Sequence, residues 1–337
     1  MQYQISMAPM EGLTGYVYRR AHHAYFAPLD SYYTPFISNK KLGSRERHDV
    51  MPEHNAGMRV IPQILTNRAD DFFEIEKQLY DYGYREVNFN LGCPSGTVTA
   101  KGRGAGFLAH PEELCQFLDE IYSKTNMKIS IKTRIGVSSE EEWPNLLSIL
   151  NRFPVERLII HPRLLKDFYK GCPHMEAYQY AKNYSLSPIC YNGDIHSVDK
   201  WRKIEDELGT QTKEIMLGRG LLINPALAEE ISEDQNLDNN KKDQLDNDEI
   251  EKIQAFFSPE QIERMKKFHD SILEGYCEEM SGDRNVLFKM KELWVYLGAG
   301  LQASPKLLKQ IKKSNSVREY KIVADAIFRD ILQDSAR

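Results

Sequence analysis

The fold is decided by the stretch Glu86-Val87-Asn88-Phe89-Asn90-Leu91-Gly92-Cys93-Pro94, an apolar strand that stops at a Gly-Cys-Pro turn. A second glycine-rich turn, Lys101-Gly102-Arg103-Gly104-Ala105-Gly106, leads to a helix predicted over residues 111–125. A short buried strand followed by a crossover helix is the repeating unit of a parallel sheet. The same stretch presents one cysteine, Cys93, to a loop, where chemistry can take place.

Outward from this stretch, the strand–helix unit repeats along the chain. Apolar runs predict eight strands, at residues 4–8, 32–36, 59–65, 86–90, 128–132, 157–161, 188–191 and 214–217. Eight such units within about 230 residues fit a (β/α)8 TIM barrel, an α/β fold. A doubly wound open sheet would need a glycine fingerprint after the first strand. The chain has Ala-Pro-Met-Glu-Gly there, which favours the barrel.

The chain divides into three predicted parts. Residues 1–235 form the barrel, residues 236–252 an acidic linker and residues 253–337 a small all-α helical bundle. The linker prediction depends on composition, because residues 231–250 carry seven acids and two lysines. After the linker the pattern is helical only, with helices predicted at 259–280, 285–297, 305–313 and 317–332.

The composition is that of an ordinary globular protein. The 337 residues are 41% hydrophobic and 28% charged, with a net charge of −5. Neither a signal peptide nor a membrane-spanning run is visible, so we expect a cytoplasmic location. The five cysteines form no CxxC pair and stand at no zinc-ligand spacing from a histidine, so free thiols and no metal site are expected. They are Cys93, Cys115, Cys172, Cys190 and Cys277.

Polar or otherwise functional groups stand at almost every predicted strand end. In barrels of this kind, active sites lie at the carboxyl ends of the strands. Each residue alone has a plain structural interpretation: Gln63 can cap a loop, Lys132 can be solvated, and His161 can belong to a turn. Together they indicate a site. The residues are Pro9, Met10, Gln63, Asn90, Cys93, Lys132, His161, Asn192, Asp194, Gly218 and Arg219.

The last two turns of the predicted barrel carry a signal for anion binding. Tyr191-Asn192-Gly193-Asp194 and Leu217-Gly218-Arg219-Gly220 follow strands seven and eight. Glycines let backbone N–H groups approach an oxyanion, and Arg219 can add a bidentate contact. Barrel enzymes often hold a cofactor phosphate at this corner.

Taken together, the motifs resemble the tRNA-dihydrouridine synthases. They occur in that family's order over residues 8–220, and the helical tail is similar to the family's C-terminal domain. The most specific is the Gly-Cys-Pro-Ser segment with the glycine-rich turn after it. The motifs are Ala8-Pro9-Met10-Glu11-Gly12, Asn90-Leu91-Gly92-Cys93-Pro94-Ser95, Lys101-Gly102-Arg103-Gly104-Ala105, Ile131-Lys132-Thr133-Arg134-Ile135-Gly136, Asn192-Gly193-Asp194-Ile195 and Leu217-Gly218-Arg219-Gly220.

The resemblance implies an FMN barrel that reduces the C5–C6 bond of uracil in tRNA, with NADPH re-reducing the flavin. It also implies a monomer, and no protein partner is evident. Pro9 and Met10 would lie against the isoalloxazine. The residues that would hydrogen-bond the flavin or its phosphate are Gln63, Lys132 and His161. Those that would hold the ribityl phosphate end are Asn192, Asp194, Gly218 and Arg219.

In the chemistry that the resemblance implies, Cys93 protonates C5 while flavin N5 delivers hydride to C6, and Asn90 contacts the target base. Hydride addition places negative charge on C5 and O4, so a proton donor is needed on the opposite face. A thiol with a pKa near 8.5 is mostly protonated at neutral pH. Lys132 would stabilise the anionic reduced flavin. The plain alternative for Cys93 is a small buried hydrophobe, against which the flanking Gly92 and Pro94 argue.

RNA contacts are expected from three regions. Residues 284–321 hold nine Lys or Arg against two acids, which suits phosphate contacts, although a solvated helical face is the alternative. Phe288, Trp294 and Tyr296 add stacking surface. Around the cysteine, Lys101 and Arg103 fit a mobile lid, and Arg163 stands in a loop expected to face the substrate. The basic residues proposed from the tail are Arg284, Lys289 and Lys291.

The sequence departs from the family's pattern in two places, and two alternative functions remain open. In the loop after strand six, Asp167 stands where the family commonly has Gln, and the acidic excursion at 231–250 matches no family function. The first rival is an FMN barrel that reduces a free pyrimidine, similar to dihydroorotate dehydrogenase. The second is a flavin-free RNA-binding protein on a barrel scaffold. Which uridine is reduced does not follow from the sequence.

Overall fold

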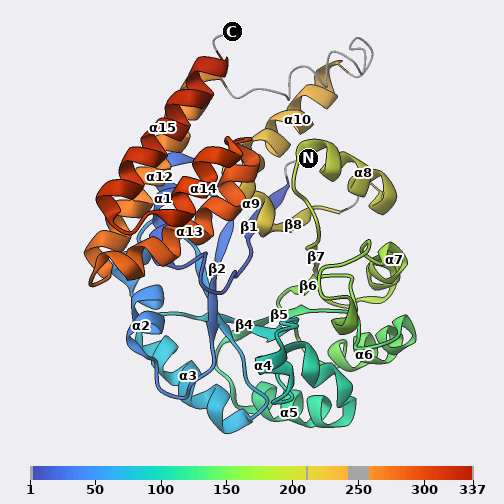
Figure 1. Cartoon of the computed structure of the whole chain (residues 1–337). Coiled ribbons are helices and arrows are strands. Elements are labelled where there is room, and N and C mark those ends of the chain that lie inside the picture. Colours follow the sequence, from blue (N-terminus) through green and yellow to red (C-terminus); the bar gives the residue numbers. More distant parts are fainter. Residues whose placement is uncertain (1–2, 210–211, 242–257, 336–337) are drawn as a thin grey trace.

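The computed structural model describes residues 3–209, 212–241 and 258–335. Eight strands form one closed barrel, in which each strand pairs in parallel with the next along the chain and β8 pairs with β1. Helices surround the barrel, and a further group of helices lies at one side (Figure 1). The predicted (β/α)8 TIM barrel with a C-terminal helical region is confirmed.

The strands lie where the apolar runs predicted them, and no strand end differs from its predicted position by more than one residue. This agreement has a physical cause, because strands of a closed parallel barrel are buried on both faces and their apolar runs are nearly continuous. The strands are β1 (Gln4–Met7), β2 (Ser31–Ile37), β3 (Val60–Ile64), β4 (Glu86–Leu91), β5 (Lys128–Thr133), β6 (Leu158–Ile160), β7 (Ile189–Tyr191) and β8 (Glu214–Leu217).

Helices follow each strand, some after a short turn. The barrel helices are α1 (Tyr16–Tyr25), α2 (Ser44–Val50), α3 (Ala69–Asp81), α4 (Gly96–Thr99), α5 (Pro111–Lys124), α6 (Trp143–Leu150), α7 (Met175–Tyr184), α8 (Val198–Leu208), α9 (Arg219–Ile223) and α10 (Leu227–Lys241). The C-terminal helices are α12 (Pro259–Glu279), α13 (Asp283–Gly300), α14 (Pro305–Lys313) and α15 (Val317–Ser335). The 3-10 turns are η1 (Pro52–Asn55), η2 (Gly104–Ala109), η3 (Glu140–Glu142) and η4 (Leu165–Asp167).

The predicted linker falls partly on helix α10. That helix continues to Lys241, so residues 236–241 are helical. Residues 242–252 of the predicted linker lie outside the described residues, and the boundaries at 235 and 253 stay predictions. In the part of the chain that the structure describes, no helix is both long and apolar enough to cross a membrane.

Two hydrophobic cores stabilise the barrel. The larger core lies between the strands and the surrounding helices, and it continues into α12, α13 and α15. The smaller core fills the barrel with side chains from alternate positions along the strands, which is how a barrel of eight strands closes its interior. Its members are Ala8, Tyr33, Ile61, Ile159, Cys190 and Met216.

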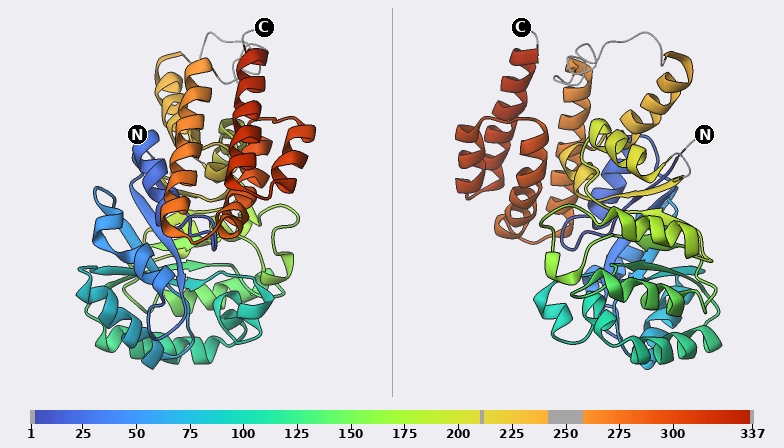
Figure 2. Two further views of the ribbon diagram at one scale, coloured as in Figure 1. Left: turned by 60° about the vertical axis from the view of Figure 1, so that its left-hand side comes forward. Right: turned by 90° about the vertical axis from the view of Figure 1, so that its right-hand side faces the viewer.

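The C-terminal helices pack directly on the barrel. Figure 2 shows this group from two sides, standing against the barrel, and helix α12 packs on α1 while α13 packs on α9. The helices approach closely at two glycines. A Cβ on Gly275 would lie 2.8 Å from Val17 Cγ1, and a Cβ on Gly300 would lie 1.9 Å from the carbonyl oxygen of Ile223. Close packing of this kind fixes the helices relative to the barrel.

A buried polar chain stands at the centre of the C-terminal helices. The hydroxyl of Tyr320 accepts a hydrogen bond from Trp294 Nε1 at 2.6 Å and lies 2.6 Å from Nε2 of His269. The other ring nitrogen of His269 lies 2.9 Å from an oxygen of Asp270. Trp294 is therefore a core residue, 2% exposed, and the prediction that it offers stacking surface to RNA is wrong.

We predict that Gly300→Ala lowers the free energy of unfolding by about 1–3 kcal/mol, because the new methyl group forces α13 away from the Ile223 carbonyl. Urea denaturation measures the change. Gly96→Ala is the matched control, since nothing lies within 4 Å of its added Cβ, and its effect should stay within about 0.5 kcal/mol. Equal denaturation midpoints for both variants would contradict the close approach of α13 to α9.

Candidate active site

The register of the strands explains why the predicted site residues converge. Side chains alternate along a strand, so a residue two positions after an interior residue also points inward. Gln63 follows Ile61, His161 follows Ile159, and Asn192 follows Cys190 in this way. Asn90 and Lys132 follow the interior polar residues Asn88 and Ser130, both fully buried. The inward row of side chains therefore continues from the barrel core into the space at the carboxyl ends.

Two adjoining cavities occupy this end of the barrel. The larger has a volume of about 490 Å³, within the range of small-molecule sites. The smaller, of about 80 Å³, lies at the ends of β7 and β8. The larger is lined by Pro9, Met10, Gln63, Asn90, Cys93, Lys132, His161 and Arg219, among others. The smaller shares Pro9, Met10, Lys132, His161 and Arg219 and adds Asn192, Asp194 and Gly218. All the predicted catalytic and cofactor residues thus lie around one continuous space.

A row of amides orients the loop that carries the cysteine. Gln63 donates to Asn88 Oδ1 at 2.7 Å and accepts from Asn90 Nδ2 at 2.7 Å. The Asn90 Oδ1 atom accepts the backbone N–H groups of Gly92 and Cys93 at 3.0 and 2.9 Å. Because a side-chain amide has two N–H donors, Asn90 keeps one beyond this network, at the wall of the larger cavity.

Cys93 is half-buried at the cavity wall. Burial raises the pKa of its thiol, against opposing effects of the Ser95 backbone and of the charges on Lys132 and Arg134. The glycine-rich turn packs on its backbone, because Ala105 N–H donates to the Cys93 carbonyl at 3.0 Å. Gly104 adopts a φ of +57°, and a Cβ there would lie 2.8 Å from the same carbonyl. The thiol is therefore held in place and kept mostly protonated near neutral pH.

Cationic side chains surround Lys132 and His161 at the carboxyl end of the barrel. Burial, together with the neighbouring Arg134, lowers the pKa of Lys132 to about 8. Burial and the surrounding cations hold the pKa of His161 well below its usual range, so this ring is neutral at pH 7. Arg163 Nη1 lies 3.2 Å from His161 Nε2. Since arginine can only donate, the Nε2 atom accepts and the proton sits on Nδ1.

Asp194 is an ion-pair bridge between two arginines. Its two oxygens accept from Arg163 Nη2 at 2.6 Å and from Arg219 Nη2 at 2.7 Å. Burial acts to raise the pKa of Asp194, but the arginine partners hold it below its ordinary value. Asp194 was predicted to hold a phosphate. In the structure its carboxylate binds Arg219, and the predicted phosphate contacts of both residues stay predictions.

Arg163 does not lie where a substrate contact was predicted. Its side chain is fully buried and donates to the carbonyl oxygens of Lys170 and Gly171 as well as to Asp194. It therefore stabilises its own loop. The unusual Asp167 does the same, since its Oδ2 accepts from Leu164 N–H at 2.8 Å and lies 2.9 Å from His174 Nε2.

Arg134 and Tyr169 belong to the site, although the sequence did not single them out. The buried guanidinium of Arg134 donates to the carbonyl oxygens of Gly92, Leu164 and Phe168, at 3.0, 2.7 and 2.6 Å. It thus joins the cysteine loop to the loop after β6. Tyr169 is half-exposed in both cavities and lies beneath the Arg219 guanidinium, 4.9 Å from ring centroid to Cζ. The signal for Arg134 was its place two residues after Lys132 in a strand-end motif.

The predicted RNA residues lie in different surroundings. Lys101 is exposed, and Arg103 lies against Asp71 with 3.6 Å between charged atoms. Arg284 is exposed and borders an open depression of about 710 Å³ that also includes Phe288 and Lys291. The Lys291 ammonium donates to the Ser314 carbonyl at 2.6 Å.

Lys289 points away from that depression. Its ammonium donates to the Gly12 carbonyl at the barrel, at 2.6 Å. The same helix sends two further side chains, Glu292 and Tyr296, to the wall of the larger cavity. Helix α13 therefore forms part of the candidate active site, which the sequence did not predict.

The fold and site define a TIM-barrel enzyme with a protonated thiol in a cavity that is also lined by Lys132, Arg134 and Arg219. The family model described as "Dihydrouridine synthase (Dus)" matches residues 6–319, and the chain belongs to this family. It is 23% identical over 328 residues to "Probable tRNA-dihydrouridine synthase" of Staphylococcus epidermidis, covering 95% of this chain and 92% of the relative. It is 27% identical over 227 residues to "tRNA-dihydrouridine synthase B" of Pasteurella multocida, covering 66% and 67%.

We predict that Cys93 is alkylated by iodoacetamide more slowly at pH 7 than free cysteine, because a raised pKa leaves less thiolate. The rate should reach half its maximum at a pH above that of free cysteine. The test uses a variant in which the other four cysteines are replaced by Ala, so that one thiol is read. Lys132→Met in that background should leave the midpoint nearly unchanged, since Lys132, whose pKa is lowered to about 8, is largely uncharged at that pH. A midpoint at or below that of free cysteine would contradict the raised pKa.

Proposed function

We propose that this protein reduces a uridine in tRNA to 5,6-dihydrouridine, with FMN as its cofactor and NADPH as the source of electrons, acting as a monomer in the cytoplasm. The observation that carries the proposal is the position of Cys93, a thiol kept protonated at the wall of a cavity whose floor is cationic. Family membership supports the reaction, and the printed names of the relatives support tRNA as the substrate.

The residues of the smaller cavity fit the phosphate end of FMN. Gly193 and Gly218 leave backbone space there, and Arg219 supplies a cation that Asp194 orients. Lys132 and the neutral His161 stand between the two cavities, where an ammonium and an N–H donor suit the polar edge of a flavin ring. When bound, FMN supplies hydride-transfer chemistry, and the role of this chain is to bind, orient and protonate.

Cys93 would serve as the acid in this reaction. Its S–H bond breaks and the proton forms a C–H bond at uracil C5, which leaves a thiolate. The positive charges of Lys132 and Arg134 favour that thiolate, since both act to lower the pKa of the thiol. Burial, which acts in the other direction, keeps the proton on sulfur before the reaction. These opposing effects suit an acid that must hold its proton and then release it.

Asn90 would fix the target base. Its carbonyl oxygen is fully used by the N–H groups of Gly92 and Cys93, while one N–H remains for a uracil carbonyl oxygen. The base and the acid are then positioned by one side chain. Exposed Lys101 and Arg284, together with the partly buried Arg103 and Lys291, are the proposed phosphate contacts, and exposed Phe288 adds a stacking surface.

Purified protein tests the proposal directly. We expect flavin absorbance bands in the protein as isolated, and dihydrouridine in unmodified transfer RNA after incubation with NADPH. Free uridine and orotate should not be reduced at a comparable rate. Reduction of a free pyrimidine with no binding to transfer RNA would instead favour the dihydroorotate dehydrogenase-like function. RNA binding by a protein without flavin would favour a binding protein on a barrel scaffold.

We predict that Cys93→Ala stays folded and yellow but reduces uridine about 100-fold more slowly or worse, because the general acid is lost. Dihydrouridine formation under saturating RNA measures the rate. Cys172→Ala is the matched control, since this exposed thiol lies outside both cavities, and it should keep the wild-type rate. Full activity of Cys93→Ala would remove the acid role from this residue.

We also predict that FMN affinity falls as pH rises through about 8. The Lys132 ammonium, whose pKa is lowered to about 8, is charged below that pH and attracts an anionic ligand, and above it the charge is lost. Titration of FMN into flavin-free protein, followed by fluorescence quenching from pH 7 to 9.5, measures the dissociation constant. Lys132→Met should bind more weakly at pH 7 and lose the step near pH 8. A step of equal size in both proteins would place the titrating group elsewhere.

A further inference from the structure

The loop between β1 and α1 forms one wall of the candidate active site. Pro9, Met10, Glu11 and Leu13 all line the larger cavity, and this loop has no regular secondary structure before α1 begins at Tyr16. The position of Met10 therefore depends on whatever holds the loop. Any movement of the loop changes the shape of the cavity in which the base and cofactor would meet.

Hydrogen bonds within the loop and from the barrel hold its two ends. Near its start and end, Met10 N–H donates to Thr14 Oγ1 at 2.8 Å, and Tyr16 N–H donates to Asp49 Oδ1 at 2.6 Å. At the outer edge, Arg45 lies 2.6 Å from Glu11, but this ion pair is exposed on both sides. Exposed ion pairs contribute little to stability.

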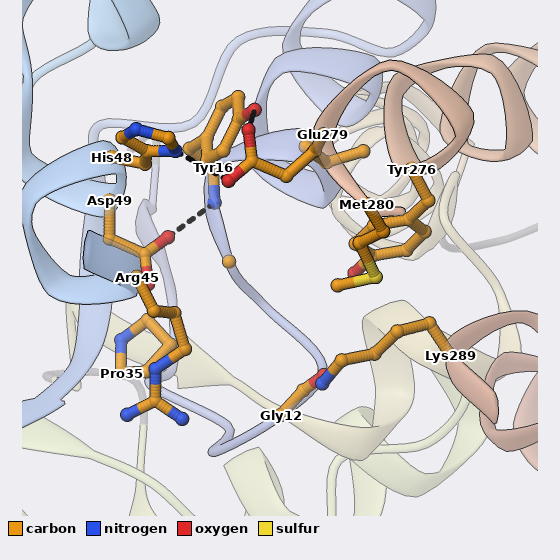
Figure 3. A pocket seen from close by; sticks show the side chains of 12 residues that line it. Gly12, Tyr16, Pro35, Arg45, His48, Asp49, Tyr276, Glu279, Met280 and Lys289 are labelled. Carbon is orange, nitrogen blue, oxygen red and sulfur yellow. Dashed lines mark hydrogen bonds and ion pairs between the residues drawn. The ribbon is translucent and has the colours of Figure 1, made fainter. Parts of the chain in front are cut away.

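The tip of the loop is held by the C-terminal helices. Gly12 stands there with a φ of +79°, which only glycine adopts readily, and its carbonyl accepts from the Lys289 ammonium at 2.6 Å. Figure 3 shows the Lys289 side chain extending from α13 to Gly12. A hydrogen bond with a charged donor is about twice as strong as a neutral one.

The helices from which Lys289 extends are themselves packed on the barrel. At the end of α12, Glu279 accepts from the Tyr16 hydroxyl at 2.8 Å and contacts His48 of α2 (Figure 3). These contacts hold the end of α12 on the barrel, and the close approach of Gly300 to α9 holds the end of α13 there. Lys289 therefore reaches Gly12 from a rigid support.

We propose that Lys289 is a positioning residue for the active-site loop and not a phosphate contact for RNA. Its ammonium holds the Gly12 carbonyl and so fixes the wall that carries Met10. If Lys289 turned to a phosphate instead, the loop tip would lose this bond. Arg284, on the same helix, is exposed and borders the open depression, so it suits the phosphate role. This inference rests on the proposed function for its kinetic consequences only.

The test compares Lys289→Met with Lys289→Gln in the full-length protein. Both remove the charge, but Gln keeps an N–H donor for the Gly12 carbonyl and Met does not. With unmodified transfer RNA transcribed in vitro, we expect kcat to fall about tenfold in Lys289→Met and at most about threefold in Lys289→Gln. The RNA dissociation constant and its dependence on salt should match wild type in both.

Arg284→Met is the matched control. Loss of a phosphate contact should weaken RNA binding and reduce the salt slope by about 1. If Lys289→Met and Lys289→Gln behave like Arg284→Met in this way, Lys289 is a phosphate contact and the positioning role is overturned. Equal loss of kcat in Met and Gln variants would also overturn it, since the donor would then not matter.

A second readout needs neither RNA nor flavin. The N–H groups of Leu13 and Thr14 both donate to the Met10 carbonyl at 3.0 Å, so their hydrogen exchange reports on the loop. We expect exchange across residues 10–16 to be about tenfold faster in Lys289→Met than in wild type, with Lys289→Gln in between. Unchanged exchange in Lys289→Met would overturn the inference. A wild-type protein that reduces no uridine yet shows this pattern would overturn the proposed function alone.

Discussion

Closure of the eight-stranded barrel is the constraint on which the rest of the structure depends. Closure fixes the register of every strand, and with it the face to which each side chain points. A shift of one residue in β5 would turn Lys132 outward among the helices. The inward row is mostly apolar in the middle of the barrel, with Asn88 and Ser130 as buried polar members, and it is polar at the carboxyl end, where Gln63, Asn90 and Lys132 lie. The candidate site is therefore a continuation of the core.

Buried arginines stabilise the loops at the carboxyl end of the barrel. Arg134 joins the loop that holds Cys93 to the loop after β6, and Arg163 ties that second loop to Asp194. Burying a guanidinium is costly unless its donors are satisfied. Here carbonyl oxygens and one carboxylate accept them, so each arginine specifies a loop conformation. The positive charge of both arginines also acts on neighbouring groups, since it helps to lower the pKa of His161.

The closed barrel explains which parts of the fold and of the candidate site could be predicted from the sequence. Strand ends and the inward residues were predictable, because a buried parallel strand has a continuous apolar run and its last polar residues stand out. Helix α2 (Ser44–Val50) had no predicted counterpart, since seven mostly polar residues show no helical period. The surroundings of Arg163 and Lys289 could not be predicted either, because their hydrogen-bond acceptors are brought near by the conformation of loops and by tertiary packing.

Tertiary packing places the cations of the basic C-terminal segment in different surroundings. The sequence did not distinguish the segment's nine Lys and Arg residues from one another. In the structure they lie on different faces of the helices. Arg284 faces solvent, Lys291 binds within the helical group, and Lys289 binds the barrel. Helix α13 also contributes Glu292 and Tyr296 to the cavity wall. The helices that would bind RNA are therefore in direct contact with the loop that bears Met10. Helix α13 would therefore both contact the RNA and determine the shape of the cavity.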